Sequence, residues 1–386
     1  MGGERVMPGH THVTTRRSAV AARALAVAAL GAAALTVGPA AQAVAPPACG
    51  STLSEDTTLT ADVRCPGASP AFHLAKGVTL DLGGHAVVGN GSGSAISAAP
   101  EGATVRNGTV RGWGVAVSNK PANPDAESDP LTLLVEDVRL ADNRVALRTQ
   151  GEFLGSWGPT VVRRTTFSGN ETGLDITWYG VATVEDSVFK DNGTAISSDA
   201  SAVQVSGTAF SRNAQGLSGN EASFLVDASR FVGNTSGISV GGTSSLTLRG
   251  STVSGSDTAV SAGLGYVVIE GSTLSRNTSA VVTELAGGLI SGTTFRDNGV
   301  AFNATQAPYY WDLVLQDNVV VRNGDGIVTQ PTDEDWTLLQ LGGNRVENNT
   351  GWGIHTPGVT DLGGNTARRN GNEPQCTGVV CVPRPS

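Results

Sequence analysis

The stretch SVFKDNGTAIS, residues 187–197, decides the fold because the chain repeats it with variations. In each copy an apolar residue is followed three residues later by Asn, and a second apolar residue comes four residues after the Asn. The other clear copies are TTFSGNETGLD (165–175), TAFSRNAQGLS (208–218), SRFVGNTSGIS (229–239) and TTFRDNGVAFN (293–303). A pattern that recurs at a near-constant interval indicates a solenoid with one structural unit per repeat.

Thirteen such units can be aligned, and each opens on an apolar anchor, from Leu82 to Leu362. The smallest spacing between anchors is 21 residues, and 22 is common. Position +5 from the anchor is apolar in every unit, and position +8 is Asn in all but two, where Trp113 and Ser256 replace it. The Asn residues at position +8 are Asn90, Asn143, Asn170, Asn192, Asn213, Asn234, Asn277, Asn298, Asn323, Asn349 and Asn370.

Each unit is rich in Ser, Thr, Gly and Val, with short apolar segments at the anchor, at position +5 and at position +12. A leucine-rich repeat has a similar period, but these units lack the length and composition for its helical segment. Three strands and three turns make one triangular coil whose strands pair in parallel with the next coil. We therefore predict an all-β fold, a single-stranded right-handed parallel β-helix (solenoid) of about 13 coils over residues 78–370.

The Asn at position +8 lies where the chain bends between the second and third strands. Asn adopts left-handed backbone angles more readily than other non-Gly residues, so we expect it to form this corner. Stacked about 4.8 Å apart, successive Asn amides can also hydrogen-bond one another. The small polar residues at position +3 suit a second stacked corner, and the Phe residues at position +5 suit the core.

Residues 1–43 have the features of a secretory signal peptide. Arg16 and Arg17 precede an apolar run over residues 24–37, and Ala41-Gln42-Ala43 supplies small residues for cleavage. The run is shorter than the roughly 20 residues of a membrane-spanning helix. We therefore favour a signal peptide over a membrane anchor, and expect cleavage near Ala43 and a secreted, extracellular protein. The export route stays open between the general and the twin-arginine pathways.

The chain is acidic once residues 1–43 are set aside, with 21 Lys and Arg against 33 Asp and Glu and a net charge of −12. Nucleic-acid binders need a basic surface, so this balance argues against a nucleic-acid partner. It also argues against unaided attraction to anionic membranes or polyanionic sugars. We expect neither a nucleic-acid nor a membrane partner, and we expect a monomer.

Four cysteines lie in two groups, Cys49 with Cys65 and Cys376 with Cys381. Thirteen coils at about 4.8 Å each make a rod of about 60 Å, whereas disulfide partners need Cα atoms within roughly 7 Å. We therefore predict the bridges Cys49–Cys65 and Cys376–Cys381. They would secure an N-terminal cap over residues 44–77 and a C-terminal cap over residues 371–386.

Two consecutive segments carry a family resemblance: GVTLDLGGHAVVGNG (77–91) and ATVRNGTVRGWGVAV (103–117). Together with the Asn-x-x-Gly-apolar units they resemble secreted right-handed β-helix repeat proteins of the pectate-lyase-like superfamily. That superfamily contains polysaccharide lyases, hydrolases and epimerases, and also binding proteins and adhesins, so the resemblance implies the fold and leaves the activity open. The catalytic signatures of its lyases, polygalacturonases and mannuronan epimerases do not occur here. No catalytic residue is therefore carried over, and whether the protein is an enzyme stays open.

The outward positions directly after the anchors alternate in charge, as in Arg106/Glu136/Arg163/Glu185 and Asp227/Arg249/Glu270. Carboxylates beside arginines can act as acids and bases on a sugar. The same alternation is also what a stabilising ladder of opposite charges between neighbouring coils requires, and we favour this ladder.

Insertions break the repeat at four places, all after the third strand and so all at one corner of the coil. They and the neighbouring turns hold aromatic side chains suited to sugar rings, and loops that interrupt a solenoid commonly carry binding. The candidates are Trp157, Trp178, Tyr179, Tyr309, Tyr310, Trp311 and Trp336. We expect two separate patches, because the insertions form two pairs roughly eight coils, or about 38 Å, apart. The alternative is that these aromatic residues pack against the rod.

Calcium is the one cofactor that the sequence suggests, since Asp333, Glu334 and Asp335 are consecutive oxygen ligands in the last insertion. The leading hypothesis is an exported β-helix protein that binds, and in an open alternative processes, an extracellular polysaccharide. A non-catalytic structural or surface-interaction protein, similar to an adhesin, is the other hypothesis. A periplasmic accessory protein for a metal cofactor is the weakest, because the chain lacks His and Met clusters.

Overall fold

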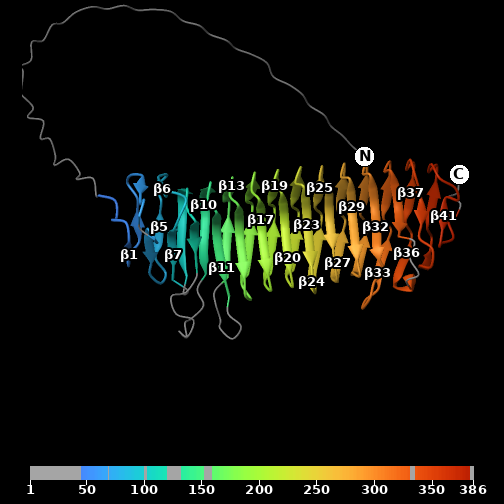
Figure 1. The fold of residues 1–386 in the computed structure, drawn as a ribbon, viewed down its shortest axis with the longest axis horizontal. Coiled ribbons are helices and arrows are strands. Elements are labelled where there is room, and N and C mark those ends of the chain that lie inside the picture. Colours follow the sequence, from blue (N-terminus) through green and yellow to red (C-terminus); the bar gives the residue numbers. More distant parts are fainter. Residues whose placement is uncertain are drawn as a thin grey trace, which may run out of the picture. The chain divides into compact units, whose positions relative to one another are not determined.

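The computed structural model describes residues 45–67, 69–99, 102–119, 132–151, 159–330 and 335–382. These residues form a stack of parallel strands and one short 3-10 helix, η1 (Trp336–Leu338). The strands follow one another in chain order along the rod of Figure 1, from β1 at the blue end to β41 at the red end. The predicted parallel β-helix is confirmed. Within these ranges no helix has the length and apolar character to cross a membrane.

Each coil contributes one strand to each of three sides of the rod. The third strands form a sheet of fifteen strands in which every neighbour comes from the adjacent coil. They are β1 (Ser51–Leu53), β4 (Phe72–Leu74), β7 (Ser94–Ala98), β9 (Val115–Ser118), β11 (Val145–Gln150), β14 (Thr172–Thr177), β17 (Thr194–Asp199), β20 (Gln215–Asn220), β23 (Ser236–Gly241), β26 (Thr258–Ala262), β29 (Ser279–Glu284), β32 (Val300–Gln306), β35 (Asp325–Thr329), β38 (Ile354–His355) and β41 (Cys376–Thr377).

The first strands carry the anchors and stack on a second side of the rod. They are β2 (Thr57–Thr58), β5 (Thr79–Asp81), the first half of β8 (Ala103–Arg111) and of β10 (Leu133–Ala141), β12 (Thr160–Arg163), β15 (Val181–Glu185), β18 (Ala202–Ser206), β21 (Ser223–Asp227), β24 (Ser244–Arg249), β27 (Gly265–Glu270), β30 (Gly287–Ser291), β33 (Leu313–Gln316), β36 (Leu339–Gly342) and β39 (Thr360–Gly363).

The second strands carry position +5 and form the remaining side. They are β3 (Val63–Arg64), β6 (Ala86–Val88), the second halves of β8 and β10, β13 (Thr166–Ser168), β16 (Val188–Lys190), β19 (Ala209–Ser211), β22 (Arg230–Val232), β25 (Thr252–Ser254), β28 (Thr273–Ser275), β31 (Thr294–Arg296), β34 (Val319–Val321), β37 (Arg345–Glu347) and β40 (Thr366–Arg368). Apolar side chains from all three sides fill the interior.

The ends of the repeat differ from the expectation in two places. In the first unit Leu80, not Leu82, pairs with Val105, because that unit has two more residues between its first and second strands. In the last unit the anchor Leu362 is wrong: it is exposed, and a bulge places Asp361 opposite Leu341. Strands also continue into both segments expected to be caps, since β1 pairs with β4 and β38 with β41.

From Asn143 onward, the Asn residues at position +8 form a hydrogen-bonded ladder inside the corner between the second and third strands. Asn213 shows the pattern: its side-chain amide donates to Asn234 Oδ1 at 2.9 Å and to the Phe189 carbonyl at 3.1 Å. Its own Oδ1 accepts from the backbone N–H of Asn192 at 3.0 Å and from the Asn192 side chain at 2.9 Å. Each buried Asn therefore satisfies buried backbone groups of the neighbouring coils, which would otherwise lack partners.

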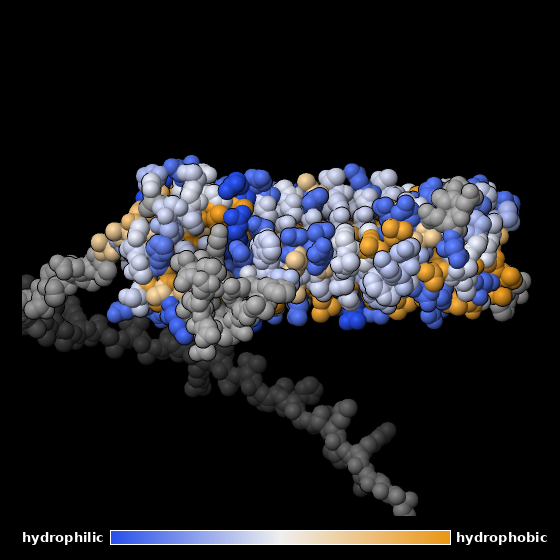
Figure 2. Space-filling view, turned by 60° about the horizontal axis from the view of Figure 1, so that its bottom comes forward, coloured by the Kyte–Doolittle hydropathy of each residue, from blue (hydrophilic) through white to orange (hydrophobic). Residues whose placement is uncertain are grey.

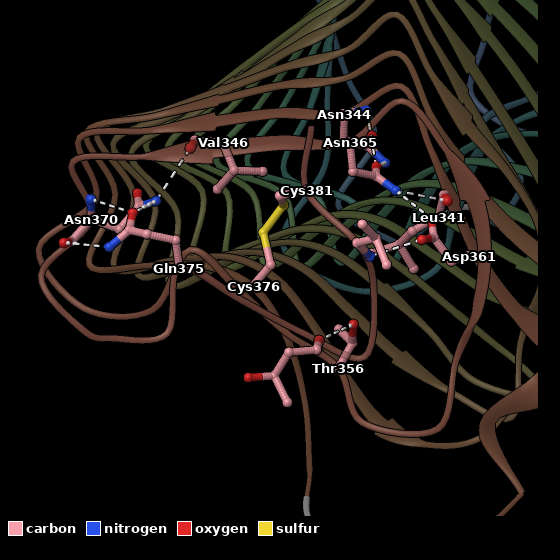
Figure 3. Close-up of a disulfide and its surroundings, with 12 residues drawn as sticks. Leu341, Asn344, Val346, Thr356, Asp361, Asn365, Asn370, Gln375, Cys376 and Cys381 are labelled. Atoms are coloured by element: carbon pink, nitrogen blue, oxygen red, sulfur yellow. Dashed lines mark hydrogen bonds between the residues drawn. A yellow bond between two sulfur atoms is a disulfide. The ribbon is translucent and has the colours of Figure 1, made fainter. Parts of the chain in front are cut away.

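The ladder has one internal break and a defined end. Ser256 interrupts it, and the buried Ser256 hydroxyl has no hydrogen-bond partner. At the C-terminal end the Asn370 amide faces Gln375 Oε1 at 2.9 Å, which closes the ladder (Figure 3). At the other end Trp113 is buried and donates through its indole N–H to the Val87 carbonyl at 3.2 Å.

The left-handed backbone angle at this corner belongs to the residue before the Asn. Asp191 and Arg212 have φ of 57° and 53°, whereas Asn192 and Asn213 are absent from the residues with positive φ. The expectation that Asn itself adopts this angle is therefore wrong. Its role is to hydrogen-bond, and the preceding position, occupied by Gly, Asp, Arg or Asn, makes the bend.

A second ladder and an aromatic stack complete the coil-to-coil contacts. At position +3 backbone N–H groups donate to the hydroxyl of the next coil, as from Ser187 to Thr208 Oγ1 at 3.3 Å. From Thr293 onward the acceptor is an Asn side-chain oxygen. In the core four Phe rings at position +5 stack with centroids 4.2, 5.1 and 4.4 Å apart. They are Phe167, Phe189, Phe210 and Phe231.

Both predicted disulfides are confirmed, with Cα atoms of Cys49 and Cys65 5.7 Å apart and those of Cys376 and Cys381 6.2 Å apart. They close the two ends of the stack. The second lies beside the last rungs of both polar ladders (Figure 3).

Replacing Asn213 with Ala should destabilise the rod by about 2–4 kcal/mol, because the buried Asn192 N–H loses its acceptor and two donors are removed. The thermal unfolding midpoint would fall accordingly. Ser256→Asn is the matched opposite change: it should restore the missing rung and raise the midpoint. An unchanged midpoint in Asn213→Ala would show that the ladder contributes little to stability.

Candidate functional site

The third corner, between the third strand and the next first strand, carries the first exposed aromatic group. The turn after β14 holds Trp178 and Tyr179, both with positive φ, at 53° and 60°. Their side chains are 63% and 49% exposed. Val181, the first residue of β15, is also exposed beside them. These two predicted candidates are therefore exposed side chains at this corner.

The second aromatic group lies at the same corner near β33. Tyr309, Tyr310 and Trp311 are exposed and in mutual contact, with centroids 4.6 Å apart for the first pair and 5.6 Å for the second. Trp311 also meets Tyr266 edge to face at 6.2 Å. A Cβ added to Gly287 would lie 2.5 Å from Trp311 Cβ, so this close approach requires glycine.

Tyr266 is a site residue that the sequence reasoning missed. It lies on β27 inside a regular unit, three residues before the anchor Ile269, whereas the predicted candidates all lie in insertions or in the turns beside them. On this strand the side chains alternate between core and solvent, and Tyr266 falls on the outer face and is exposed. A tyrosine at an outward position of a regular coil was the signal that could have found it.

A hollow of about 410 Å³ lies between the two aromatic groups. Its floor is a row of small side chains at the starts of consecutive first strands, Ala202, Ser223 and Ser245, each the register partner of the next. Tyr179 and Val181 line one end. Tyr266 follows Ser245 directly in the register at the other end. The floor of the hollow therefore runs along the rod axis, from one coil to the next.

The register places the two aromatic groups on one strip. Val181 pairs with Ala202, and four steps along the same row lead from Val181 to Tyr266. At the strand spacing this is about 19 Å. The expectation of two separate patches about 38 Å apart therefore does not describe the exposed aromatic residues, because Tyr266 extends the second group toward the first. We call this strip, from Tyr179 to Trp311, the aromatic groove.

Figure 2 brings forward the edge of the rod that is lowest in Figure 1, where the turns after the third strands lie. Hydrophobic residues gather there in patches separated by hydrophilic ones. Outward positions of the first strands also hold apolar residues: Leu225, Val268 and Leu289 are half-buried and alternate with the core residues of their strands. An aromatic and apolar strip with small polar residues on its floor can hold a chain of sugar rings by stacking.

The remaining predicted residues contribute differently. Trp336 is buried, because η1 folds it under the turn that contains Gly358, and it cannot offer a ring face to a ligand. Trp157, Asp333 and Glu334 lie outside the described residues. Asp335 precedes η1, and its carboxylate accepts from the Thr337 N–H at 3.0 Å. Hydrogen bonding from the Thr337 side chain, and then from its backbone N–H, lowers the pKa of Asp335.

A second hollow of about 370 Å³ lies at the same corner, lined by Leu285, Ala307, Pro308, Tyr309, Asp335 and Leu338. It has one carboxylate and is otherwise mainly apolar. The described residues contain no group of three His, Cys, Asp or Glu that could hold a metal ion.

The charge ladder predicted on the first strands is present in part. Arg163 contacts Glu185 and Arg249 contacts Glu270, both at 2.7 Å. Glu136, however, is bound by Arg164, at 3.1 Å. Arg106 pairs with Asp81 rather than with Glu136, at 3.0 Å. These carboxylates therefore join neighbouring coils.

Glu221 differs from them because it lines the first hollow, where it is the one carboxylate. It lies at the turn between β20 and β21 with a positive φ of 52°. Glycoside hydrolysis ordinarily uses two carboxyl groups that flank the scissile bond. The described residues that line this hollow provide one carboxyl group, that of Glu221.

Comparison with known proteins agrees with the fold. Residues 215–370 match the family described as "Right handed beta helix region". No curated protein matches the sequence. The family match over residues 215–370 and the parallel pairing of strands along the described chain agree on a parallel β-helix fold.

Among solved structures, the chain is similar to a double mutant of the periplasmic alginate epimerase AlgG, with 13% identity, coverage of 77% of this chain and 76% of that chain, and a TM-score of 0.46. It is also similar to the catalytic unit of a GH87 α-1,3-glucanase from Streptomyces thermodiastaticus strain HF3-3, with 13% identity, coverage of 83% and 62%, and a TM-score of 0.39. The endo-xylogalacturonan hydrolase from Aspergillus tubingensis matches with 14% identity, coverage of 86% of this chain and 92% of that chain, and a TM-score of 0.18.

Acidification should loosen the coil stack. Hydrogen bonding by the Arg164 guanidinium holds the pKa of Asp137 below its ordinary value of 3.8. The pKa of Asp137 is lower in the folded protein than in the unfolded chain, where it is 3.8. The pair therefore stabilises the fold fully above pH 3.8, and this stabilisation is lost as the pH falls through the pKa of the folded protein. The thermal midpoint should be level above about pH 5 and fall below about pH 4.

Arg164→Gln should lower the thermal unfolding midpoint at neutral pH. It should also reduce the decrease of that midpoint between neutral pH and acidic pH. The same two-residue clamp recurs at Asp191–Arg212 and Asp297–Arg322, so a single variant removes only part of the slope. A fall of equal size in Arg164→Gln and the unchanged protein would contradict a contribution from the Asp137–Arg164 pair.

Proposed function

We propose that this protein is exported and binds a linear extracellular polysaccharide along the aromatic groove. One observation carries the proposal: exposed Tyr179 lines one end of a hollow whose floor is made of Ala202, Ser223 and Ser245, and exposed Tyr266 is the register partner of Ser245. Sugar rings present flat C–H faces that pack on aromatic rings. The small floor residues leave room for the rings between the two aromatic ends.

The direction of the groove favours a polymer over a small ligand. It follows the rod axis through successive coils, which rise about 4.8 Å each. Extended sugar chains advance by a similar length per ring, so each coil can meet one sugar unit. A polymer spanning Tyr179 to Tyr266 would therefore contact about four to five units.

An exported protein fits the other features of the chain. Both disulfides belong to an oxidising compartment, and residues 1–43 read as a signal peptide. Binding without catalysis is the simpler interpretation of the groove, because among the described residues that line its hollow Glu221 is the one carboxylate. A purely structural role has less support, since it leaves the exposed aromatic residues without a purpose.

The first test is a glycan array with and without calcium, followed by titration of a hit against two variants. Trp311→Ala and Tyr266→Ala should each weaken binding by roughly 10- to 100-fold, since each removes one stacking platform of about 1.5–3 kcal/mol. Trp352→Ala is the matched control, because Trp352 stacks on His355 beside β38, away from the third corner. Equal losses in all three variants, or none, would contradict the groove.

A second test blocks the floor. Ser223→Ile places a β-branched residue on a strand, where it is well tolerated, and fills the middle of the hollow. It should abolish binding of the array hit and leave the thermal midpoint within a few degrees. Ser218→Ile, on the outer face of β20, makes the same change on another side of the rod and should bind normally. Normal binding by Ser223→Ile would place the ligand elsewhere.

Product formation decides whether the protein also acts on its ligand. Reducing-end and 235-nm unsaturation assays on the array hit would reveal hydrolysis or elimination. Binding without product supports the proposed role, and product that disappears in Glu221→Gln would show catalysis at this hollow instead.

A further inference from the structure

We propose that the side of the rod formed by the second strands is a separate surface that binds a linear anionic polysaccharide. We define this second-strand face as the second strands and the single residue that follows each of them. It does not include the third corner, so it is distinct from the aromatic groove, and the inference does not depend on that groove.

The second-strand face is strongly basic although the chain is acidic. It holds twelve Arg and Lys against four Asp and Glu, a net charge of +8, whereas the rest of the described residues hold seven against 22, a net of −15. The basic residues are Arg64, Arg111, Arg139, Lys190, Arg212, Arg230, Arg276, Arg296, Arg322, Arg345, Arg368 and Arg369. The acidic ones are Asp142, Asp191, Asp297 and Glu347.

Many of these cations are free to meet a ligand. Seven of them form no ion pair within the described part of the chain, and all but Lys190 of these seven are exposed. They are Arg64, Arg111, Arg139, Lys190, Arg230, Arg276 and Arg369. On the same face Glu347 is buried and already bound by Arg345 at 3.1 Å and Arg368 at 2.9 Å, so it offers little repulsion to an anion.

The cations follow the coil spacing in the C-terminal part of the rod. The five coils from β28 to β40 are consecutive in the register, and each contributes at least one arginine. These are Arg276, Arg296, Arg322, Arg345 and Arg368. A guanidinium on every coil, at about 4.8 Å per coil, offers one cationic group to each ring of a polymer that carries one charge per sugar. Arg276 forms no ion pair in the described part of the chain, whereas the other four already contact Asp297 or Glu347, so an anionic ligand would share those guanidinium groups. Arg binds carboxylate or sulfate through two parallel hydrogen bonds, which suits such a repeat.

The chemistry between the arginines favours a polysaccharide over a nucleic acid. Outward positions of the described second strands hold Thr, Ser, Ala and Val beside the charges, and none is aromatic. Single-stranded nucleic acids are bound largely by stacking on aromatic side chains, which this face lacks. Hydroxyl groups beside arginines instead suit a polymer of hydroxyl and carboxylate groups.

The separation of charge also gives the rod a preferred orientation. Each coil is triangular, so the second-strand face lies opposite the third corner. Charges beyond about 8 Å are largely screened at physiological ionic strength, so an anionic polymer near this face meets its net +8 and not the acidic sides. A rod held by this face would present the aromatic groove away from the polymer that holds it.

The test measures binding of the full chain to polygalacturonate, heparin, polyphosphate and a DNA duplex at several salt concentrations. Polygalacturonate or heparin should bind at low salt and lose at least about tenfold in affinity between 50 and 200 mM salt. The combined variant R139Q/R230Q/R276Q/R369Q should bind at least about tenfold more weakly and with a shallower salt dependence. Trp311→Ala and Tyr266→Ala should leave this binding unchanged, which separates it from the groove.

The control variant R148Q/R163Q/R164Q/R249Q removes four arginines from the other sides and changes the net charge equally. It should change the affinity by less than about threefold. Absence of binding at low salt, or equal losses in the two combined variants, would overturn the surface. Tighter binding of DNA or polyphosphate than of both polysaccharides would overturn the assignment of its partner.

Discussion

The fold depends on the polar ladders that run through its corners. Every coil turns sharply, and each turn buries backbone N–H and C=O groups that the parallel sheets do not pair. The Asn residues at position +8 satisfy them: Asn192, for example, accepts from Asn170 and donates to Asn213 and to the Phe167 carbonyl. Because an amide can do this only when the neighbouring coil is in register, the ladder fixes the spacing and stacking of all three sides. The hydroxyl groups at position +3 and the stacked Phe rings then provide further contacts between coils that the Asn amides hold in register.

A register fixed in this way turns sequence positions into surfaces. Residues at the same position of successive coils form a straight row, with about 4.8 Å between neighbours. The row to which any side chain belongs therefore follows from its position in the repeat. The aromatic groove and the second-strand face both arise from this property. Tyr266 lines up with Ser245 and Gly287 because their strands pair residue by residue. The arginines of the second-strand face gather on one side because each lies on a second strand or directly after it in its coil.

The fold could be predicted because the residues that specify it recur at a fixed spacing in the sequence. The candidate site could not, because it depends on which residues of different coils lie next to one another. The period, the two disulfides and the stacked Phe residues follow from spacing alone. The backbone geometry does not: the positive φ falls on Asp191 rather than Asn192, since both positions tolerate it and only the ladder decides between them. Trp336 looks exposed in the sequence but is buried by η1. The net charge of −12 hid the basic face, because a sum over residues carries no information about sides of a rod.

Hydrogen–deuterium exchange with the bound glycan from the array tests the central claim most directly, because it reports where the ligand lies without changing the protein. A ligand in the aromatic groove should slow exchange in the turns and first-strand starts around Tyr179, Ala202, Ser223, Ser245 and Tyr266. Backbone amides of the third-strand sheet, and those at the two disulfide-closed ends, should exchange as in the free protein. Protection spread evenly along the rod, or confined to the third-strand sheet, would contradict the account and remove the groove as the binding site.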